Sequence, residues 1–279
     1  MEIWSPRVNM FFKEKLVAAK FFDDYSDEVV EGGDRIHIPG ISEMTTSSIN
    51  TTSGIVTPTN VSDTKTTLTI DTWKGASIFL SDFQAAQVAK SYRLKEKYIQ
   101  DMGYACAKVV DETIIGQAVN LTPSVGDSTT LLATTIEKAF GILASYSVPR
   151  EECVFFVHPK TWYDQILQVQ KYYDASQFGK VVTPIGTIDS LYGTPVVVTA
   201  LVDTTTYAGE TGTAAGAYRN FIAHRSAFVY ALGNLPGGGS VRLQEKTNAN
   251  LGVYPTVDVM FGTRTLNAYR GVKVLSDIA

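Results

Sequence analysis

The three histidines of this chain, His37, His158 and His224, are the side chains best suited to proton transfer or metal binding near neutral pH. They lie far apart, in or beside strand patterns, and none belongs to a His-x-x-x-His or His-Glu-x-x-His motif. The two cysteines, Cys106 and Cys153, form no Cys-x-x-Cys pair. The sequence therefore gives no support for a zinc site.

A nucleophilic cysteine is also disfavoured. Cys153 and His158 are five positions apart, an odd offset that places them on opposite faces of a straight strand. We expect both cysteines to be small buried side chains in a reducing compartment. The glycine run 237–239 is not followed by Lys and Ser or Thr, and no Gly-x-Ser-x-Gly motif occurs, so no phosphate-binding loop or hydrolase nucleophile is predicted.

The densest carboxylate cluster, residues 23–28, has neither the glycine nor the glutamate spacing of a calcium loop. It also lacks the apolar surroundings that would raise a pKa for acid–base catalysis, so a solvated turn is expected. We predict no catalytic residues, no cofactor and no metal. An enzyme whose catalytic groups are dispersed through the sequence remains the alternative.

The composition of the chain argues against further classes of function. The chain has 279 residues, 44% of them hydrophobic, with 24 Lys and Arg against 28 Asp and Glu, a net charge of −4. This is enough for one large domain or two modest ones. No basic cluster is present to neutralise phosphates, which argues against a surface that grips nucleic acid. No secretory signal and no apolar run of about 20 residues is visible, so a soluble protein without a membrane partner is expected.

The segment between the first two predicted strands is rich in threonine. Residues 35–39 alternate with period two, as in a strand, and their expected partner is the segment 67–71. The connection 39–66 is much longer than an ordinary hairpin loop. Because threonine favours extended strands, we predict a long two-stranded arm that projects from the body and is stabilised by what it touches. A mobile surface loop is the alternative.

Two helices are expected in the first half of the chain. An amphipathic helix covers residues 8–22, and a proline-free stretch from 82 to 121 has an apolar stripe at helical spacing. A forty-residue helix would be about 60 Å long. A sphere of this chain length is about 50 Å across, so the body must be flat or elongated. Gly103 and Gly116 are the points where this helix could break.

Beyond a boundary at residues 121–128 the pattern becomes mixed. A helix is expected over 132–143 and another near 162–169. Strands are expected at 153–157, 195–199, 221–223, 227–232, 257–261 and 265–275. The fold class is therefore α+β.

In this order the elements resemble a major capsid protein of a tailed bacteriophage with the Hong Kong 97-like fold. The resemblance covers nearly the whole chain, and it rests on order and spacing because each motif alone is weak. The residues that carry it are Ile3-Trp4-Ser5-Pro6, Gly33 to Gly40, Leu68-Thr69-Ile70-Asp71, Asp82-Phe83-Gln84, the long helix, Val157-His158-Pro159, Gly186 to Val197 and Ala223-His224-Arg225-Ser226-Ala227.

The resemblance implies a division into an N-terminal arm, a peripheral domain and an axial domain. The arm would be residues 1–31, and the axial α/β domain would be residues 122–240. The peripheral domain would combine residues 32–121 with 241–279, including an extended loop at 39–66 and a spine helix at 82–121. The expected assembly contacts lie in the arm and the extended loop: Trp4, Phe11, Phe12, Thr45, Thr51, Thr57 and Thr59.

The resemblance also implies a function and a set of partners. The chain would assemble with copies of itself, as hexamers and pentamers, into an icosahedral or prolate shell that encloses double-stranded DNA. Its mild acidity would let it hold DNA without adhesion. A separate scaffolding protein, a portal and a decoration protein would be further partners, and synthesis would take place in the host bacterial cytoplasm. An encapsulin-like nanocompartment shell or another phage structural protein is the alternative.

Overall fold

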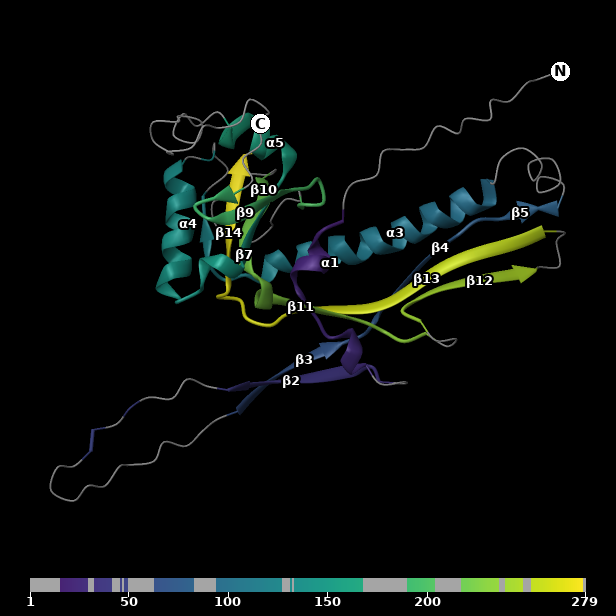
Figure 1. The fold of residues 1–279 in the computed structure, drawn as a ribbon, viewed down its shortest axis with the longest axis horizontal. Coiled ribbons are helices and arrows are strands. Elements are labelled where there is room, and N and C mark those ends of the chain that lie inside the picture. Colours follow the sequence, from purple (N-terminus) through teal and green to yellow (C-terminus); the bar gives the residue numbers. More distant parts are fainter. Residues whose placement is uncertain are drawn as a thin grey trace.

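The fold consists of two sheets joined end to end, with a hairpin projecting from the longer one (Figure 1). The computed structural model describes residues 16–29, 33–41, 46, 48–49, 63–82, 94–126, 131, 133–167, 190–203, 217–235, 239–247 and 252–277. The expected elongated body is visible in Figure 1, where helix α3 runs along its length and the second sheet stands at one end. None of the helices in these residues is both long and apolar enough to span a bilayer.

The first sheet is organised around its longest strand, β13 (Gly252–Thr265). This strand pairs antiparallel with four others, which are separate in sequence: β4 (Thr72–Ser77), β5 (Leu80–Ser81), β11 (Phe228–Leu232) and β12 (Val241–Thr247). The short strand β1 (Asp23–Asp24) adds to β11 in parallel. It follows helix α1 (Ala18–Phe21) and precedes the 3-10 turn η1 (Ser26–Glu28).

Helix α3 (Leu94–Gly116) covers one face of the first sheet. Its predicted stripe is buried at Met102, Cys106, Val110 and Ile114, against Val257, Val259 and Phe261 of β13. The helix passes through Gly103 without a break and gives way at Gly116 to the 3-10 turn η2 (Gln117–Asn120). The described α-helix is therefore shorter at its C-terminal end than the predicted 82–121, and residues 83–93 lie outside the described part of the chain.

The second sheet has the strand order β6-β14-β10-β7-β9-β8. Helix α4 (Ala133–Ser145) packs on one of its faces through Ile136, Ala139, Phe140 and Leu143. The strands are β6 (Ser124–Val125), β7 (Cys153–Val157), β8 (Ser190–Leu191), β9 (Thr194–Val198), β10 (Ala217–His224) and β14 (Gly271–Asp277). Short helical turns complete this half: η3 (Arg150–Glu152), α5 (Pro159–Thr161), the π-helical turn η4 (Trp162–Ile166) and η5 (Arg225–Ala227).

The predicted pairing of the arm strands is confirmed, and it extends into the predicted loop. Strand β2 (Arg35–Ile41) pairs antiparallel with β3 (Asp63–Thr69), from Arg35 opposite Thr69 to Ile41 opposite Asp63. Residues 39–41 and 63–66 therefore belong to strands and not to the loop. The segment that follows β3 forms two strands, because the pairing with β13 is interrupted at residues 78–79 between β4 and β5.

Strand pairing cuts across the predicted domain division, which itself stays a prediction. Strand β14 lies within residues 241–279 of the predicted peripheral domain and pairs with β10 and β6 in the second sheet. Strand β11 lies within residues 122–240 of the predicted axial domain and pairs with β13 in the first sheet. The chain therefore crosses between the sheets in the turn before β11 and again in the turn before β14.

Candidate assembly surfaces and the joint between the sheets

All seven residues predicted as assembly contacts lie outside the described residues: Trp4, Phe11, Phe12, Thr45, Thr51, Thr57 and Thr59. The structure does describe the points where both predicted arms meet the body. It also describes the exposed faces of the first sheet.

The root of the β2–β3 hairpin is fixed on the first sheet by an apolar cluster. Ile36 and Ile38 of β2 alternate with exposed residues and pack with Leu68 and Ile70 against Val229 and Ala231 of β11. Strand β3 crosses the sheet closely at Gly262, where an added Cβ would lie 2.0 Å from the carbonyl oxygen of Thr69. At the outer end of the paired strands, Ile41 is 84% exposed. The hairpin is thus firmly rooted, while its outer apolar surface has no cover among the described residues.

The root of the N-terminal segment is held by one buried carboxylate on α3. Asp111, which is 1% exposed, accepts hydrogen bonds from the backbone N–H groups of Val17, Ala18 and Ala19 at 2.7, 3.0 and 3.0 Å. The Tyr230 hydroxyl donates to the Ala19 carbonyl oxygen at 2.7 Å. Three N–H donors on one carboxylate compensate the cost of burying its charge. These contacts fix the point at which the N-terminal segment leaves the body.

The face of the first sheet opposite α3 carries an exposed tryptophan. Trp73 of β4 is 65% exposed, yet its Nε1–H donates to Asp258 Oδ2 at 2.9 Å. Arg242 of β12 binds the same carboxylate, with its Nη2 at 2.6 Å and its Nε at 3.2 Å. The hydrogen bond from Arg242, and to a smaller extent the one from Trp73, lowers the pKa of Asp258 below its ordinary value of 3.8. The indole is therefore held in one orientation with its apolar surface facing solvent.

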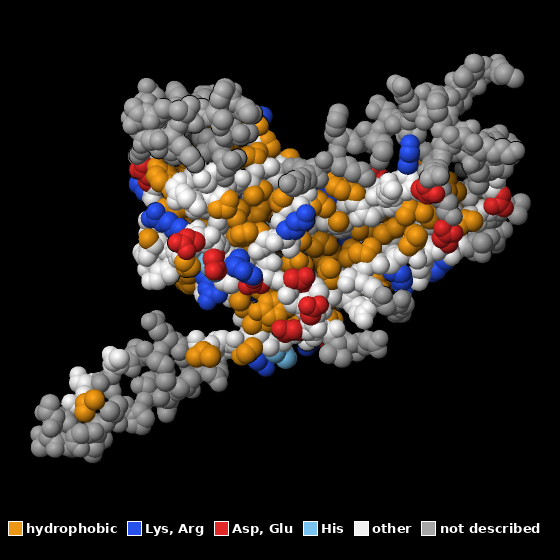
Figure 2. Space-filling model, viewed as in Figure 1, with side chains coloured by type: hydrophobic (Ala, Val, Ile, Leu, Met, Phe, Trp, Pro, Cys, Tyr) orange, Lys and Arg blue, Asp and Glu red, His pale blue; other side chains and the backbone are white. Residues whose placement is uncertain are grey.

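The alternation of side chains along β12 and β13 determines which residues lie on the face opposite α3. Asp258 and Arg242 are register partners and share a face, whereas Val257 and Val259 point to the other face, toward α3. Two residues of β12 on that helix-covered side, Val241 and Leu243, are nevertheless 53% and 50% exposed. They extend the apolar face past the helix, and Figure 2 shows hydrophobic side chains running along this half of the body.

The two sheets meet in a joint formed by three stretches, residues 117–123, 224–227 and 266–270. Backbone hydrogen bonds tie the three together: Thr122 N–H to the Ala268 carbonyl at 3.1 Å, His224 N–H to the Arg270 carbonyl at 2.9 Å, and Leu266 N–H to the Ala227 carbonyl at 2.9 Å. Each crossing is thus held by another, so the sheets cannot separate at one crossing alone.

One side of the joint is filled by an aromatic cluster. Phe22 contacts Phe156 and Phe228 with ring centroids 5.7 and 4.9 Å apart, and Phe221 lies 4.9 Å from Phe156 and 5.9 Å from Phe228. Phe156 and Phe221 belong to the second sheet and Phe228 to the first. The cluster joins both sheets and the N-terminal root into one hydrophobic core.

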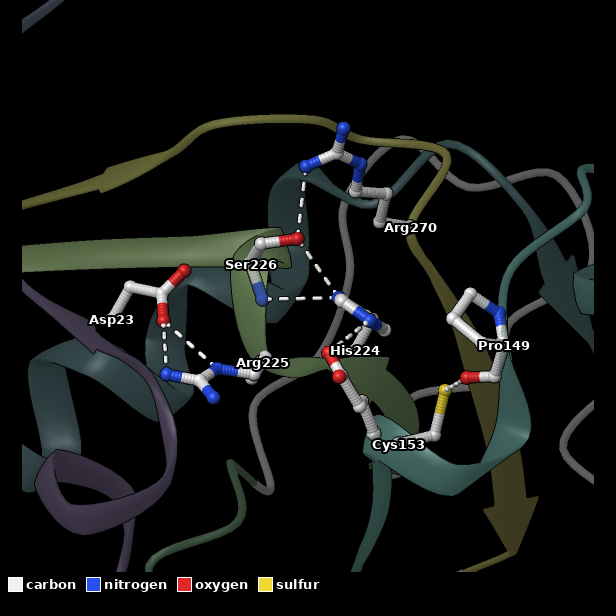
Figure 3. A network of polar contacts seen from close by, with 8 residues as sticks. Asp23, Pro149, Cys153, His224, Arg225, Ser226 and Arg270 are labelled. Atoms are coloured by element: carbon white, nitrogen blue, oxygen red, sulfur yellow. Dashed lines mark hydrogen bonds and ion pairs between the residues drawn. The ribbon is translucent and has the colours of Figure 1, made fainter.

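The other side of the joint is a polar network centred on His224 (Figure 3). The imidazole Nδ1 accepts the Ser226 backbone N–H at 3.2 Å and lies 2.8 Å from Ser226 Oγ, which in turn accepts from Arg270 at 2.8 Å. On its other side, Nε2 lies 3.1 Å from Glu152 Oε2. Arg225, in the same turn, pairs with Asp23 of β1 at 3.0 Å. The network thus links the turn before β11 to η3, β1 and the turn before β14.

The histidines and cysteines do not come together into a catalytic group in the described residues. No set of three or more His, Cys, Asp or Glu side chains there could hold a metal ion. His158 stacks on Tyr218 with centroids 3.9 Å apart, while the Cys153 thiol donates to the Pro149 carbonyl. Burial raises the pKa of Cys106, and it raises the pKa of Cys153 to about 11. Both thiols are protonated near neutral pH and are poor nucleophiles.

Comparisons with known proteins agree with this architecture. No family model matches the chain, and no curated protein matches it significantly in sequence. Among solved structures, a chain of Mycobacterium phage Che8 matches with a TM-score of 0.79 and 19% identity, over 98% of this chain and 96% of that one. The capsid of cyanophage P-SCSP1u gives 0.78 and 13%, over 100% and 93%. The capsid of the native GTA particle gives 0.75 and 10%, over 99% and 95%.

These similarities establish the fold. The chain has the α+β fold of the phage and particle structures it matches, and the predicted fold class is confirmed. At 10 to 19% identity they do not by themselves assign a function.

Proposed function

We propose that this chain is the major capsid protein of a tailed phage, which assembles with copies of itself into an icosahedral or prolate shell around double-stranded DNA. The observation that carries this proposal is the match of the whole fold, over at least 98% of this chain, to phage and particle capsids. The match includes both sheets in their mutual arrangement, which a shared substructure alone would not give.

The exposed surfaces of the first half support the same function. The hairpin is firmly rooted but has an uncovered apolar end, so contact with a neighbouring subunit would stabilise it by burying this end. The same holds for the first sheet, which exposes Trp73 on one face and Val241 and Leu243 beside the helix. In this assignment the first sheet with α3 forms the peripheral domain and the second sheet with α4 forms the axial domain. Strand β14 belongs to the axial domain, and β11 belongs to the peripheral domain.

The wider set of partners follows from the same proposal. Subunits would gather as hexamers and pentamers, with a portal at one vertex and a scaffolding protein during assembly. A decoration protein would bind outside. With a net charge of −4 the shell would enclose DNA without gripping it. Assembly would take place in the bacterial cytoplasm, where the chain is synthesised.

The test is assembly of the chain co-expressed with its scaffolding protein, observed by negative-stain electron microscopy and sedimentation. We expect closed polyhedral shells. Uniform monomers would contradict the proposal and favour the enzyme alternative, and tubes would favour a tail component. Shells that load an enzyme through a short docking peptide would favour the nanocompartment.

A hairpin variant separates assembly from folding. Ile41 pairs with Asp63, so residues 42–62 can be replaced by Asn-Gly, which closes two antiparallel strands with a two-residue turn. We expect this variant to keep the melting temperature of the native subunit but to lose shells. Unchanged shell yield would show that the hairpin end plays no part in assembly. A control with a Gly-Ser substitution at Thr64 and Lys65, within the paired strands, should instead weaken the hairpin itself.

A further inference from the structure

The polar side of the joint contains a histidine whose protonation state decides whether its hydrogen bonds can form. A ring nitrogen that accepts a backbone N–H carries no proton, so the contact from Ser226 N–H to His224 Nδ1 fixes the neutral tautomer with hydrogen on Nε2. That Nε2–H then donates to Glu152. The same Nδ1 contact is the N-cap of η5, the turn through which the chain passes from β10 to β11.

Protonation of this ring would oppose its surroundings. A proton on Nδ1 would face the Ser226 N–H, a second donor, and the cap would be lost. Ser226 Oγ, which lies 2.8 Å from Nδ1, could accept the new proton beside its bond from Arg270, but it could not replace the ring as the acceptor of the Ser226 N–H. The new positive charge would be repelled by Arg270 and attracted by Glu152 from η3 and, more weakly, by Asp23 from β1.

The balance of these effects favours the neutral ring. The His224 side chain is 12% exposed, and burial, assisted by Arg270, lowers its pKa below the ordinary value of 6.5 despite Glu152. Asp23 is already paired with Arg225, and the Cys153 thiol on the neighbouring strand is uncharged. A groove of about 640 Å³ reaches His224, Glu152 and Arg270, so solvent protons have access to the ring.

We propose that His224 stabilises the joint in an acid-sensitive way. The neutral imidazole caps the η5 turn, and protonation in mildly acidic solution breaks this cap and weakens the connection between the two sheets. The aromatic cluster on the opposite side of the joint remains, so the expected change is local opening of the crossing and not unfolding of the sheets. This inference concerns one chain and does not depend on shell formation.

The chain offers a matched control for the test. His158 is also an N-cap, and its Nδ1 accepts the backbone N–H of Lys160 at 3.2 Å, but it lies on α5, outside the joint. Asparagine at either position supplies a side-chain oxygen that can accept the same N–H without titrating. His224→Asn should therefore keep the cap at every pH, and His158→Asn should leave the joint as it is.

The measurement is amide hydrogen exchange of the full chain at about pH 5 and about pH 8, corrected for the intrinsic exchange rates. We expect the Ser226 amide to exchange about fivefold faster at the lower pH in the native chain, which corresponds to the loss of one hydrogen bond. The His158→Asn variant should show the same change, and the His224→Asn variant should show none. Equal protection at both pH values in the native chain, or a persistent change in His224→Asn, would overturn the proposal.

A second variant keeps the test decisive if His224→Asn does not fold. Arg270→Gln removes the nearby positive charge but retains a side-chain donor for Ser226 Oγ. The charge that disfavours the imidazolium is then gone, so release should begin at higher pH than in the native chain. An unchanged or lower midpoint would contradict the assignment of His224 as the titrating group.

Discussion

The two sheets differ in how completely the chain covers them. In the second sheet, every residue of β7 and the first seven residues of β10 are buried, with α4 on one face and the joint core on the other. In the first sheet, α3 covers one face, and the hairpin root covers the opposite face at β11 but leaves β4 and β12 largely exposed. The second sheet is therefore stabilised mainly by contacts within the chain, whereas the exposed part of the first sheet would be stabilised by contact with another molecule.

The largest effect on stability is expected in the well-covered second sheet. Phe221→Ala removes a fully buried ring from the aromatic cluster and should lower the free energy of unfolding by about 3–5 kcal/mol. The matched change in the first sheet, Leu243→Ala, removes a half-exposed side chain and should cost about 1 kcal/mol or less. Urea unfolding of both variants measures the contrast. Comparable losses of unfolding free energy in the two variants would mean that both sheets are stabilised to the same extent by contacts within the chain.

A smaller effect is expected where the chain covers the first half with its own N-terminal root. Asp111→Asn weakens the charge-assisted hydrogen bonds to the N–H groups of residues 17–19 and should cost about 2 kcal/mol. Because the root would open more often, trypsin should cleave after the exposed Lys20 up to about thirtyfold faster.

The neighbouring carboxylate provides the control for this experiment. Glu112 is exposed and pairs only at the surface with Lys108, so Glu112→Gln should change neither stability nor cleavage. If Asp111→Asn behaves like Glu112→Gln, the buried carboxylate is not what holds the root.

The smallest expected effect concerns the bare face of the first sheet. The folded-state pKa of Asp258 is below its ordinary 3.8, so its stabilising contribution is complete above that value and is lost as the pH falls through the lower folded pKa. The native chain should therefore lose more stability between about pH 5 and pH 2.5 than Asp258→Asn does. Urea midpoints at both pH values give this difference. Parallel losses in the two proteins would show that the contacts of Trp73 and Arg242 with this carboxylate contribute nothing.

Local patterns in the sequence were enough to predict several elements but not how the strands combine. Period-two alternation placed the β2–β3 pairing, and the apolar stripe placed α3, because each signal lies within a short segment. The sheet to which β14 belongs could not be predicted from such signals. β13 and β14 are consecutive and alternate in the same way, and only tertiary pairing sends them to different sheets.

The candidate sites were harder to predict for the same reason. Trp73 and Asp258 are 185 residues apart, and no local pattern connects them. His224 was a candidate for proton transfer and part of a motif that carried the resemblance, but no local pattern linked it to Glu152 or Arg270. Asp111 did leave a signal, since it directly follows Val110 of the apolar stripe, and a carboxylate on a buried helical face needs a partner. The sequence therefore indicated that Asp111 needs a partner, but it did not identify the three N–H groups that Asp111 binds.

The order of the strands in the first sheet has a consequence during synthesis. Strands β4, β5, β11 and β12 all pair with β13, yet all four leave the ribosome before it does. Until β13 has emerged, the nascent chain therefore carries α3 and these four strands without the strand that joins them. Their apolar faces are open in that interval, which favours aggregation.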